Sequence, residues 1–422
     1  MAWEKFAVSK FGSLVSRLGG SAIWIAVVIA GAYVTNFDEP YLPFAIAGAA
    51  VFFLRAKPSR WEIYGWLFAS ALLVKAVHLS AIPFWVLRVA AGFSLLGFGA
   101  ILLLGLRALW SGREGQQNTI AFLAPALILV FFILTTAHVL SFSGQLSPQT
   151  EDAWLYAFDG SLGFQPSFAV GRIMYNSIFL ARSALLTYLA LPFAMAVVCA
   201  WKIPPTAKRI SWHMLSIILL AGVGGWLLYN VVPGTGPIYA FHADFPWHEI
   251  AYRDLPRLAL GKMSLPTFIP RNAMPSLHMG WALLLYWNSK GFPRVLRAAF
   301  LVFLFLTVIA TLGGGQHYFI DLVVSLPFVL AVQSAASLAR PNRMRHVAAM
   351  TVGLFLTFGW LLMVRFGLGL AMISTAIPWS LILLTCAVTF WLRSWSSSAN
   401  ANLRVDILSA PPSSLAAASG RR

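Results

Sequence analysis

Two histidines and one aspartate are the residues whose types and spacing could do chemistry. His317 and Asp321 lie four residues apart, where a glycine-rich turn runs into an apolar segment, so a helix would place both on one face. His278 opens another apolar segment, directly after Pro275 and Ser276. Asp321 lies about one turn inside a predicted membrane helix, where a carboxylate needs a partner. His317 is the nearest candidate partner.

This set of side chains suits phosphoryl transfer by a histidine nucleophile. A neutral imidazole attacks phosphorus, a neighbouring carboxylate fixes its tautomer, and a second histidine protonates the departing oxygen. The Pro-Ser turn at 275–276 would leave backbone N–H groups unpaired at a helix start, which is a ready site for an anion. Each histidine alone would more simply be a polar residue at a helix end, but the three side chains and the turn together favour catalysis. This chemistry requires no metal and no other cofactor.

The composition is that of an integral membrane protein. Of the 422 residues, 59% are hydrophobic and 10% are charged, whereas a soluble domain has about 25% charged residues. The apolar segments are long and many lack the alternation of barrel strands, so we expect helical spans. The two cysteines, Cys199 and Cys386, each lie inside an apolar run and imply neither a disulfide framework nor a thiolate metal site.

The apolar segments predict an all-α, polytopic membrane protein with about twelve transmembrane helices. The expected spans are 22–36, 41–54, 62–80, 84–106, 119–142, 179–201, 212–232, 275–290, 297–314, 317–339, 346–366 and 373–392. They divide the chain into an N-terminal membrane region of about four spans (1–118), a six-helix core (119–340) and two C-terminal spans (341–393). We expect the Ser-, Ala- and Pro-rich tail (394–422) to be disordered.

The net charge of +17 is explained by topology rather than by a nucleic-acid partner, because Lys and Arg accumulate in the cytoplasmic loops of membrane proteins. Placing both termini in the cytoplasm puts the long loops 143–178 and 233–274, and the turn before His317, on the outer face. The basic clusters then lie inside; they are Lys202–Lys208–Arg209, Lys290–Arg294–Arg297 and Arg340–Arg343–Arg345. The chemistry is therefore predicted to be extracytoplasmic, which fits the lack of a nucleotide-binding loop.

Two short motifs carry a resemblance to a known family. Pro-Ser-Leu-His at 275–278 and His-Tyr-Phe-Ile-Asp at 317–321 resemble the second and third signature motifs of the type 2 phosphatidic acid phosphatase superfamily. Their residues are most similar to those of the inositol phosphorylceramide synthase-like (inositolphosphotransferase) branch. The resemblance covers about residues 119–340 and implies a six-helix catalytic core.

The resemblance also implies roles for individual residues. His317 would be the nucleophile, Asp321 its activator, His278 the general acid and Ser276 a phosphate contact. The sequence departs from the family in its third motif, which usually begins Ser-Arg where residues 310–311 are Ala-Thr here. The first motif is also absent in strict form, and Leu277 replaces the usual Gly of the second, as in the transferase-like branch. Another cation must therefore balance the phosphate.

The outer loop 233–274 offers candidate cations. Arg257 and Arg271 are the first choices because Arg makes bidentate contacts with phosphate, and Lys262 is a further candidate in this loop. Arg182, near the outer end of the span 179–201, is a candidate outside the loop. Ordinary surface charge explains the basic residues of this loop equally well.

The predicted function is transfer of a phosphoryl or phospho-headgroup from a lipid donor to a lipid or alcohol acceptor, through a phosphohistidine-type intermediate. The first alternative is a phosphatase of phosphatidic acid or of polyprenyl phosphate or diphosphate, because the same histidines serve when water is the acceptor. A transporter is the second alternative, suggested by the span number and by the intramembrane Lys75, Arg88 and Asp321. It would predict internal repeats, and none is evident. Membrane lipids are the expected partners, protein partners stay open, and no nucleic acid is expected.

Overall fold

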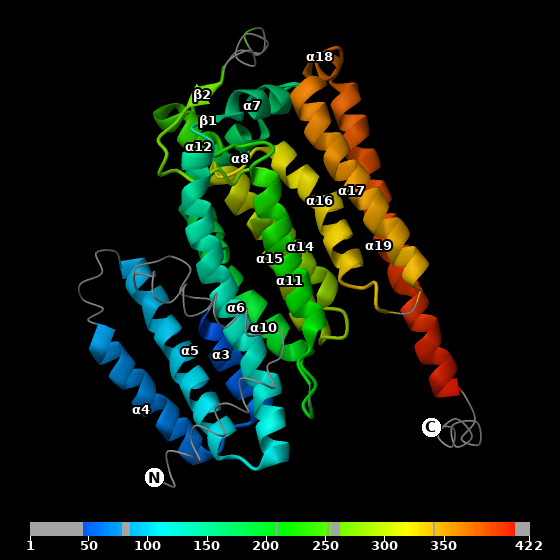
Figure 1. Ribbon diagram of the computed structural model, residues 1–422. Coiled ribbons are helices and arrows are strands. Elements are labelled where there is room, and N and C mark those ends of the chain that lie inside the picture. The colour runs from blue at the N-terminus through cyan, green and yellow to red at the C-terminus, as the bar shows by residue number, and fades with distance from the viewer. Residues whose placement is uncertain are drawn as a thin grey trace.

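The chain is a helical bundle in the computed structural model, which describes residues 45–77, 85–207, 209–250, 254, 262–340 and 342–409 (Figure 1). The N-terminal helices form a layer at one side of the bundle. They are α3 (Ile46–Val51), a π-helical turn (Phe52–Ala56), α4 (Arg60–Val77) and α5 (Trp85–Trp110). The long helix α6 (Arg113–Leu146) packs against α5 and α11 and links this layer to the rest.

Helix α16 (Phe319–Ala335) lies at the centre of the larger part of the bundle. Every residue from Ile320 to Ser334 is buried, as expected for a helix that is apolar on all sides. It contacts the short helix α7 (Asp152–Gly160) and four longer helices. The longer ones are α11 (Trp212–Tyr229), α14 (Leu277–Asn288), α17 (Arg343–Phe366) and α19 (Ala376–Ser409). Helix α15 (Arg294–Gly313) packs against α14 and leads through the glycine-rich turn back to α16.

One helical span is bent at a break. Helices α9 (Ile178–Leu189) and α10 (Leu191–Lys202) meet at 47°. Pro192 lies in the first turn of α10, where its ring lacks an N–H and cannot continue the hydrogen-bond ladder of the preceding helix.

Short elements cover the end of the bundle at which α14 and α16 begin, the upper end in Figure 1. They are α7 (Asp152–Gly160), α8 (Pro166–Tyr175), α12 (Pro237–Ala240), a 3-10 turn (His242–Asp244) and α18 (Leu368–Ala371). Strands β1 (Gln149–Thr150) and β2 (Met263–Ser264) form a two-stranded antiparallel sheet there. This layer supplies much of the candidate site.

The structure agrees with a helical membrane protein, but a count of about twelve spans is not confirmed. Within the described residues, six helices are long and apolar enough to cross a bilayer, or seven if the bent pair is one span. The first predicted span, 22–36, lies outside the described residues. The predicted spans 275–290 and 317–339 form helices of 12 and 17 residues, which are short for a bilayer of about 30 Å.

The C-terminal tail differs from its prediction. Helix α19 runs on to Ser409, so residues 394–409 are helical where the sequence predicted disorder, and 410–422 lie outside the described residues.

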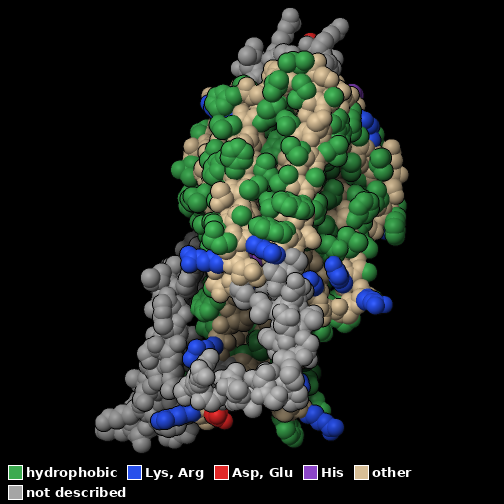
Figure 2. Space-filling view, turned by 90° about the vertical axis from the view of Figure 1, so that its right-hand side faces the viewer, with side chains coloured by type: hydrophobic (Ala, Val, Ile, Leu, Met, Phe, Trp, Pro, Cys, Tyr) green, Lys and Arg blue, Asp and Glu red, His purple; other side chains and the backbone are tan. Residues whose placement is uncertain are grey.

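A broad hydrophobic surface covers the side of the bundle formed by α17 and α19 (Figure 2). Large apolar side chains such as Phe355 and Leu362 are mostly exposed on it. Lys and Arg side chains gather at its lower edge. An apolar band bordered by basic residues is typical of a lipid-facing surface.

Candidate active site

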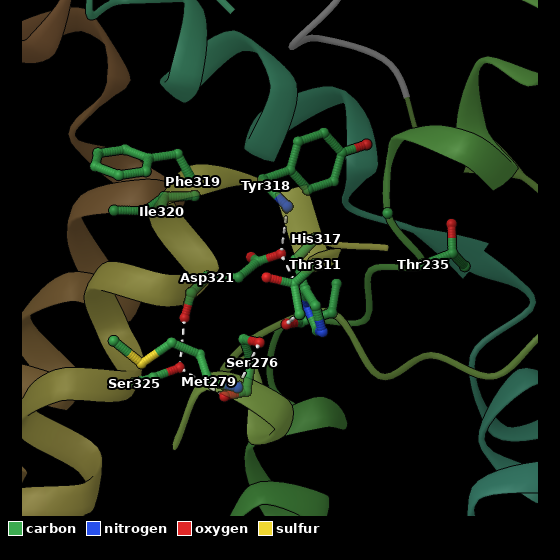
Figure 3. A network of polar contacts seen from close by, with 12 residues as sticks. Thr235, Ser276, Met279, Thr311, His317, Tyr318, Phe319, Ile320, Asp321 and Ser325 are labelled. Carbon is green, nitrogen blue, oxygen red and sulfur yellow. Dashed lines mark hydrogen bonds and ion pairs between the residues drawn. The ribbon is translucent and has the colours of Figure 1, made fainter. Parts of the chain in front are cut away.

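The two motifs lie side by side because the starts of α14 and α16 are hydrogen-bonded together (Figure 3). The N–H of Ser276 donates to the Asp321 carbonyl at 3.1 Å. The Ser325 hydroxyl lies 2.9 Å from the Ser276 carbonyl and 2.8 Å from the Asp321 carbonyl. Segments about forty residues apart in the sequence are therefore fixed at one point. Sequence reasoning gave Ser325 no role.

The His317 imidazole is buried and its tautomer is set by a backbone carbonyl. Nδ1 lies 2.8 Å from the Ala273 carbonyl oxygen and 3.5 Å from Oδ2 of Asp321. A carbonyl oxygen only accepts, so Nδ1 carries the proton and Nε2 keeps its lone pair. The sequence predicts that the Asp321 carboxylate alone fixes the tautomer of His317. In the structure, the nearer partner of Nδ1 is the Ala273 carbonyl oxygen. The resulting form of His317 is the one a nucleophile needs.

Asp321 is fully buried in the first turn of α16. Its Oδ2 accepts the Tyr318 N–H at 2.8 Å, and its Oδ1 has no hydrogen-bond partner among the described residues. A carboxylate in the first helical turn is favoured by the helix dipole. Its position beside Nδ1 would stabilise positive charge on His317.

His278 lies on α14 and stacks on Tyr188, from the last turn of α9, with ring centroids 3.9 Å apart and planes within 16°. The His278 and His317 rings are close enough for their charges to interact. Tyr188 therefore fixes the plane of the second imidazole. Sequence reasoning did not single out this tyrosine.

The first turn of α14 presents unused backbone donors. The Ser276 hydroxyl is buried and accepts weakly from the Met279 N–H at 3.5 Å, as a helix cap. In the part of the chain that the structure describes, the N–H groups of Leu277 and His278 make no hydrogen bond. Such groups attract anions, so this turn beside the histidines is suited to a phosphate oxygen.

Asp159 caps the helix that carries the catalytic motif. Its carboxylate accepts the N–H groups of Phe319 at 2.6 Å and Ile320 at 3.0 Å. Burial raises the pKa of Asp159 well above its usual range, and the hydrogen bonds from Phe319 and Ile320 oppose this rise. This residue holds the backbone that follows His317.

Asp152 joins a second loop to the same motif. It accepts from the Thr235 N–H at 3.0 Å, the Gly236 N–H at 2.9 Å and the Tyr318 hydroxyl at 3.0 Å. Asp152 and Asp159 are seven residues apart in α7, about two turns, and so share a face. That spacing of two acids in an otherwise apolar segment was the available signal for both.

The loop 233–236 packs tightly against the turn before His317. Gly236 has φ +101°, and a Cβ there would lie 2.3 Å from the Gln316 carbonyl oxygen. The Ile238 N–H donates to the Gly315 carbonyl at 2.9 Å, and Gly315 itself has φ +67°. Only glycine fits both positions without strain. These contacts fix the backbone on the N-terminal side of His317.

Arg271 does not offer a phosphate contact in this structure. Its guanidinium is buried and donates to five backbone carbonyls, which belong to Ser147, Pro148, Leu265, Pro266 and Ile269. All of its donors are thereby engaged. The prediction from sequence is corrected: Arg271 ties the outer loop to the end of α6.

The structure does not place the other predicted cations at the histidines. Arg182 and Lys262 are exposed, and no hydrogen bond or ion pair links either to His278 or His317. Arg257 lies outside the described residues. The phosphate ligands therefore stay a prediction, with the N–H groups of the α14 turn as the donors that the geometry adds.

No group of three or more His, Cys, Asp or Glu side chains suited to a metal ion occurs among the described residues.

A family comparison covers the site. Residues 153–335 match the family model described as PAP2 superfamily, a stretch that runs from α7 to the end of α16. This supports the superfamily part of the predicted resemblance, while the synthase-like branch stays a prediction. No curated protein and no solved structure matches the chain.

Proposed function

We propose, on the premise that residues 153–335 form a PAP2 superfamily domain, that the chain moves a phosphoryl or phospho-headgroup from a membrane lipid to a lipid or alcohol acceptor. Members of this superfamily are generally phosphatases or phosphotransferases. The observation that carries the proposal is the His317 imidazole, whose Nδ1–H is held by the Ala273 carbonyl. Its Nε2 is left with the lone pair that attacks phosphorus.

In the first step, Nε2 of His317 forms a bond to phosphorus while the bond from phosphorus to the leaving oxygen breaks. The electron pair of that bond goes to the oxygen, which takes a proton from His278. The product is a phosphohistidine. Asp321 stabilises the positive charge that appears on the ring, since its Oδ2 lies 3.5 Å from Nδ1.

In the second step, an acceptor hydroxyl attacks the same phosphorus and gives its proton to His278. The bond between phosphorus and Nε2 breaks, and its electron pair returns to the neutral imidazole. A lipid or alcohol acceptor makes the enzyme a transferase, and water makes it a phosphatase. The phosphatase is the alternative function, because the same side chains serve both outcomes. The transporter alternative loses one of its supports, since the buried Asp321 is accounted for by Tyr318 and His317.

The distribution of charge supports an extracytoplasmic site. The ends of α10, α14 and α16 that lie far from the histidines carry the clusters around Lys202, Lys290 and Arg340. Lys and Arg favour the cytoplasmic side, so the histidines lie on the opposite face. Helix α19 ends at the basic end, which supports a cytoplasmic C-terminus.

Incubating the purified protein with a panel of lipid phosphates and candidate acceptor lipids tests the proposal. Mass spectrometry should detect a new phosphodiester or phosphomonoester of the acceptor that depends on both His317 and His278. Release of free phosphate alone, with every acceptor tried, would select the phosphatase. Absence of any product with the whole panel, from folded protein, would count against both.

A further inference from the structure

Basic side chains from four elements gather at the end of the bundle opposite to the candidate active site. Arg340 follows α16, His346 lies in the first turn of α17, Arg393 lies on α19 and His213 lies in the first turn of α11. These elements pack together, since α16 contacts α11, α17 and α19, and α17 contacts α19. The charges of Arg340 and Arg393 act on each other and on both histidines. This set is called the lower basic cluster below.

Two histidines of the lower basic cluster have buried nitrogens without partners. His346 is 4% exposed, and within the described residues neither of its ring nitrogens makes a hydrogen bond. Nδ1 of His213 lies 3.1 Å from the Ala336 carbonyl, but its Nε2 is buried and unpaired there. Unpaired buried polar groups are rare because each carries a desolvation penalty.

No acid lies close to the cluster along the elements that build it. The sequence has no Asp or Glu between Asp321, at the other end of α16, and Asp406. Within the described residues, neither Arg340 nor Arg393 makes an ion pair. Like charges brought together on partly buried surface need a counter-charge, which the described chain does not supply.

Local contacts account for only part of this arrangement. The Arg393 guanidinium lies 5.2 Å from the Trp287 ring centroid, a contact of about 0.5–1 kcal/mol at exposed sites. The C-terminal end of α16 also favours nearby cations. Neither effect provides acceptors for the unpaired nitrogens of His213 and His346. An anion with several oxygens would pair with the guanidinium groups and with imidazole N–H groups together.

We propose that the lower basic cluster binds the phosphate group of an anionic membrane lipid. The cluster includes the first turn of α17 and part of α19, the two helices that form the hydrophobic surface, and Lys and Arg side chains gather at the lower edge of that surface (Figure 2). Phe390 and Trp391, adjacent to Arg393 on α19, are 48% and 63% exposed. Acyl chains would pack along these apolar side chains while the headgroup reaches the cations, an arrangement that a free phosphate ion cannot use.

Native mass spectrometry of the detergent-solubilised protein, titrated with phosphatidic acid, tests this proposal. The His317→Ala background prevents turnover, so lipid bound at the active site contributes equally to every variant. Arg393→Gln should weaken the binding of one phosphatidic acid molecule by about tenfold, the effect of losing one charge-assisted contact. Arg340 is more exposed than Arg393, and Arg340→Gln should weaken binding by about threefold. This second variant keeps the test valid if Arg393→Gln misfolds.

Arg297→Gln is the matched control. Arg297 lies at the same end and also sits over an aromatic ring, that of Tyr286 at 5.7 Å, but on α15. Its substitution should leave binding within about twofold. Equal weakening in Arg297→Gln and Arg393→Gln, or none in Arg393→Gln and Arg340→Gln, would overturn the proposal. If phosphatidylcholine bound equally tightly and its binding also depended on Arg393, the ligand would not need an anionic headgroup. If inorganic phosphate bound in an Arg393-dependent way without lipid selectivity, the ligand would not need to be a lipid.

Discussion

The two ends of α16 are built from opposite chemistry. At its start, the Asp159 carboxylate accepts backbone N–H groups. At its end, Ser337 and His213 donate to backbone carbonyls, and Arg340 and Arg393 lie nearby. The helix dipole explains the sign of each set. The start of α16 is nearly complete within the chain, whereas its end keeps unpaired cations and imidazole nitrogens. One end is therefore fixed by the fold, and the other is suited to an external ligand.

Substitution of the histidines at the two ends gives the largest expected contrast. His317→Ala should abolish turnover, by about 10⁴-fold or more, because no other group replaces the attacking nitrogen. His213→Ala, at the other end of α16, should leave turnover within about twofold. Both variants are assayed with the lipid phosphate found to react, after circular dichroism confirms the helical fold. Full activity of His317→Ala would remove it as the nucleophile.

Asp321→Asn keeps the shape at the start of α16 but removes its charge. We expect a fall in kcat of about 100-fold, since the amide cannot stabilise the imidazolium that forms on His317. KM should change little, because Asp321 does not contact the lipid in the proposed mechanism. Steady-state kinetics separates the two parameters. An unchanged kcat would show that the Ala273 carbonyl alone is sufficient.

Asp159→Ala tests how far the start of α16 depends on its cap. Two buried N–H groups lose their acceptor, so the free energy of unfolding should fall by about 2–5 kcal/mol. Asp159→Asn keeps one acceptor and should lose about half as much. Thermal unfolding in detergent measures the change, with Asp244→Ala as the control because the Asp244 side chain is 67% exposed. A loss as small as that of Asp244→Ala would contradict the capping role.

His346→Leu should have the smallest effect on stability, and this separates the two ends most sharply. In lipid-free detergent the free energy of unfolding should stay equal or rise by up to about 1 kcal/mol, because two unpaired buried nitrogens are removed. Added phosphatidic acid should then stabilise the variant less than the unsubstituted chain. Thermal unfolding with and without the lipid measures both. A large loss of stability without lipid would show that His346 is already satisfied by the fold.

The histidine pair and Asp321 could be placed from sequence because each stands at a helix start. Helical spacing brings His317 and Asp321 to one face, and the antiparallel course of α15 brings α16 back beside α14. The partners of the motif could not be placed in this way. Asp159 contacts residues 160 positions further along the chain, and such a contact leaves no local pattern.

Arg271 shows a different limit of the sequence. A basic residue in an outer loop looks available to a phosphate, but its donors are used by backbone carbonyls. Every residue has a carbonyl, so composition and spacing cannot reveal which ones converge. The count of about twelve spans is not confirmed for a related reason. Apolar runs predict burial, and α14 is a helix of 12 residues whose apolar side chains are buried by protein neighbours.

The same hydrogen bonds of Arg271 bear on how many times the chain crosses the membrane between the two segments that they join. They join Ser147 and Pro148, at the end of α6, to the loop at 265–271, so both segments lie at one end of the bundle. A chain that leaves one side and returns to it crosses an even number of times. Among the described residues between them, α11 is long and apolar enough to be one crossing. With α11 as one crossing, an even number requires the bent pair α9 and α10 to be a full passage rather than a re-entrant hairpin.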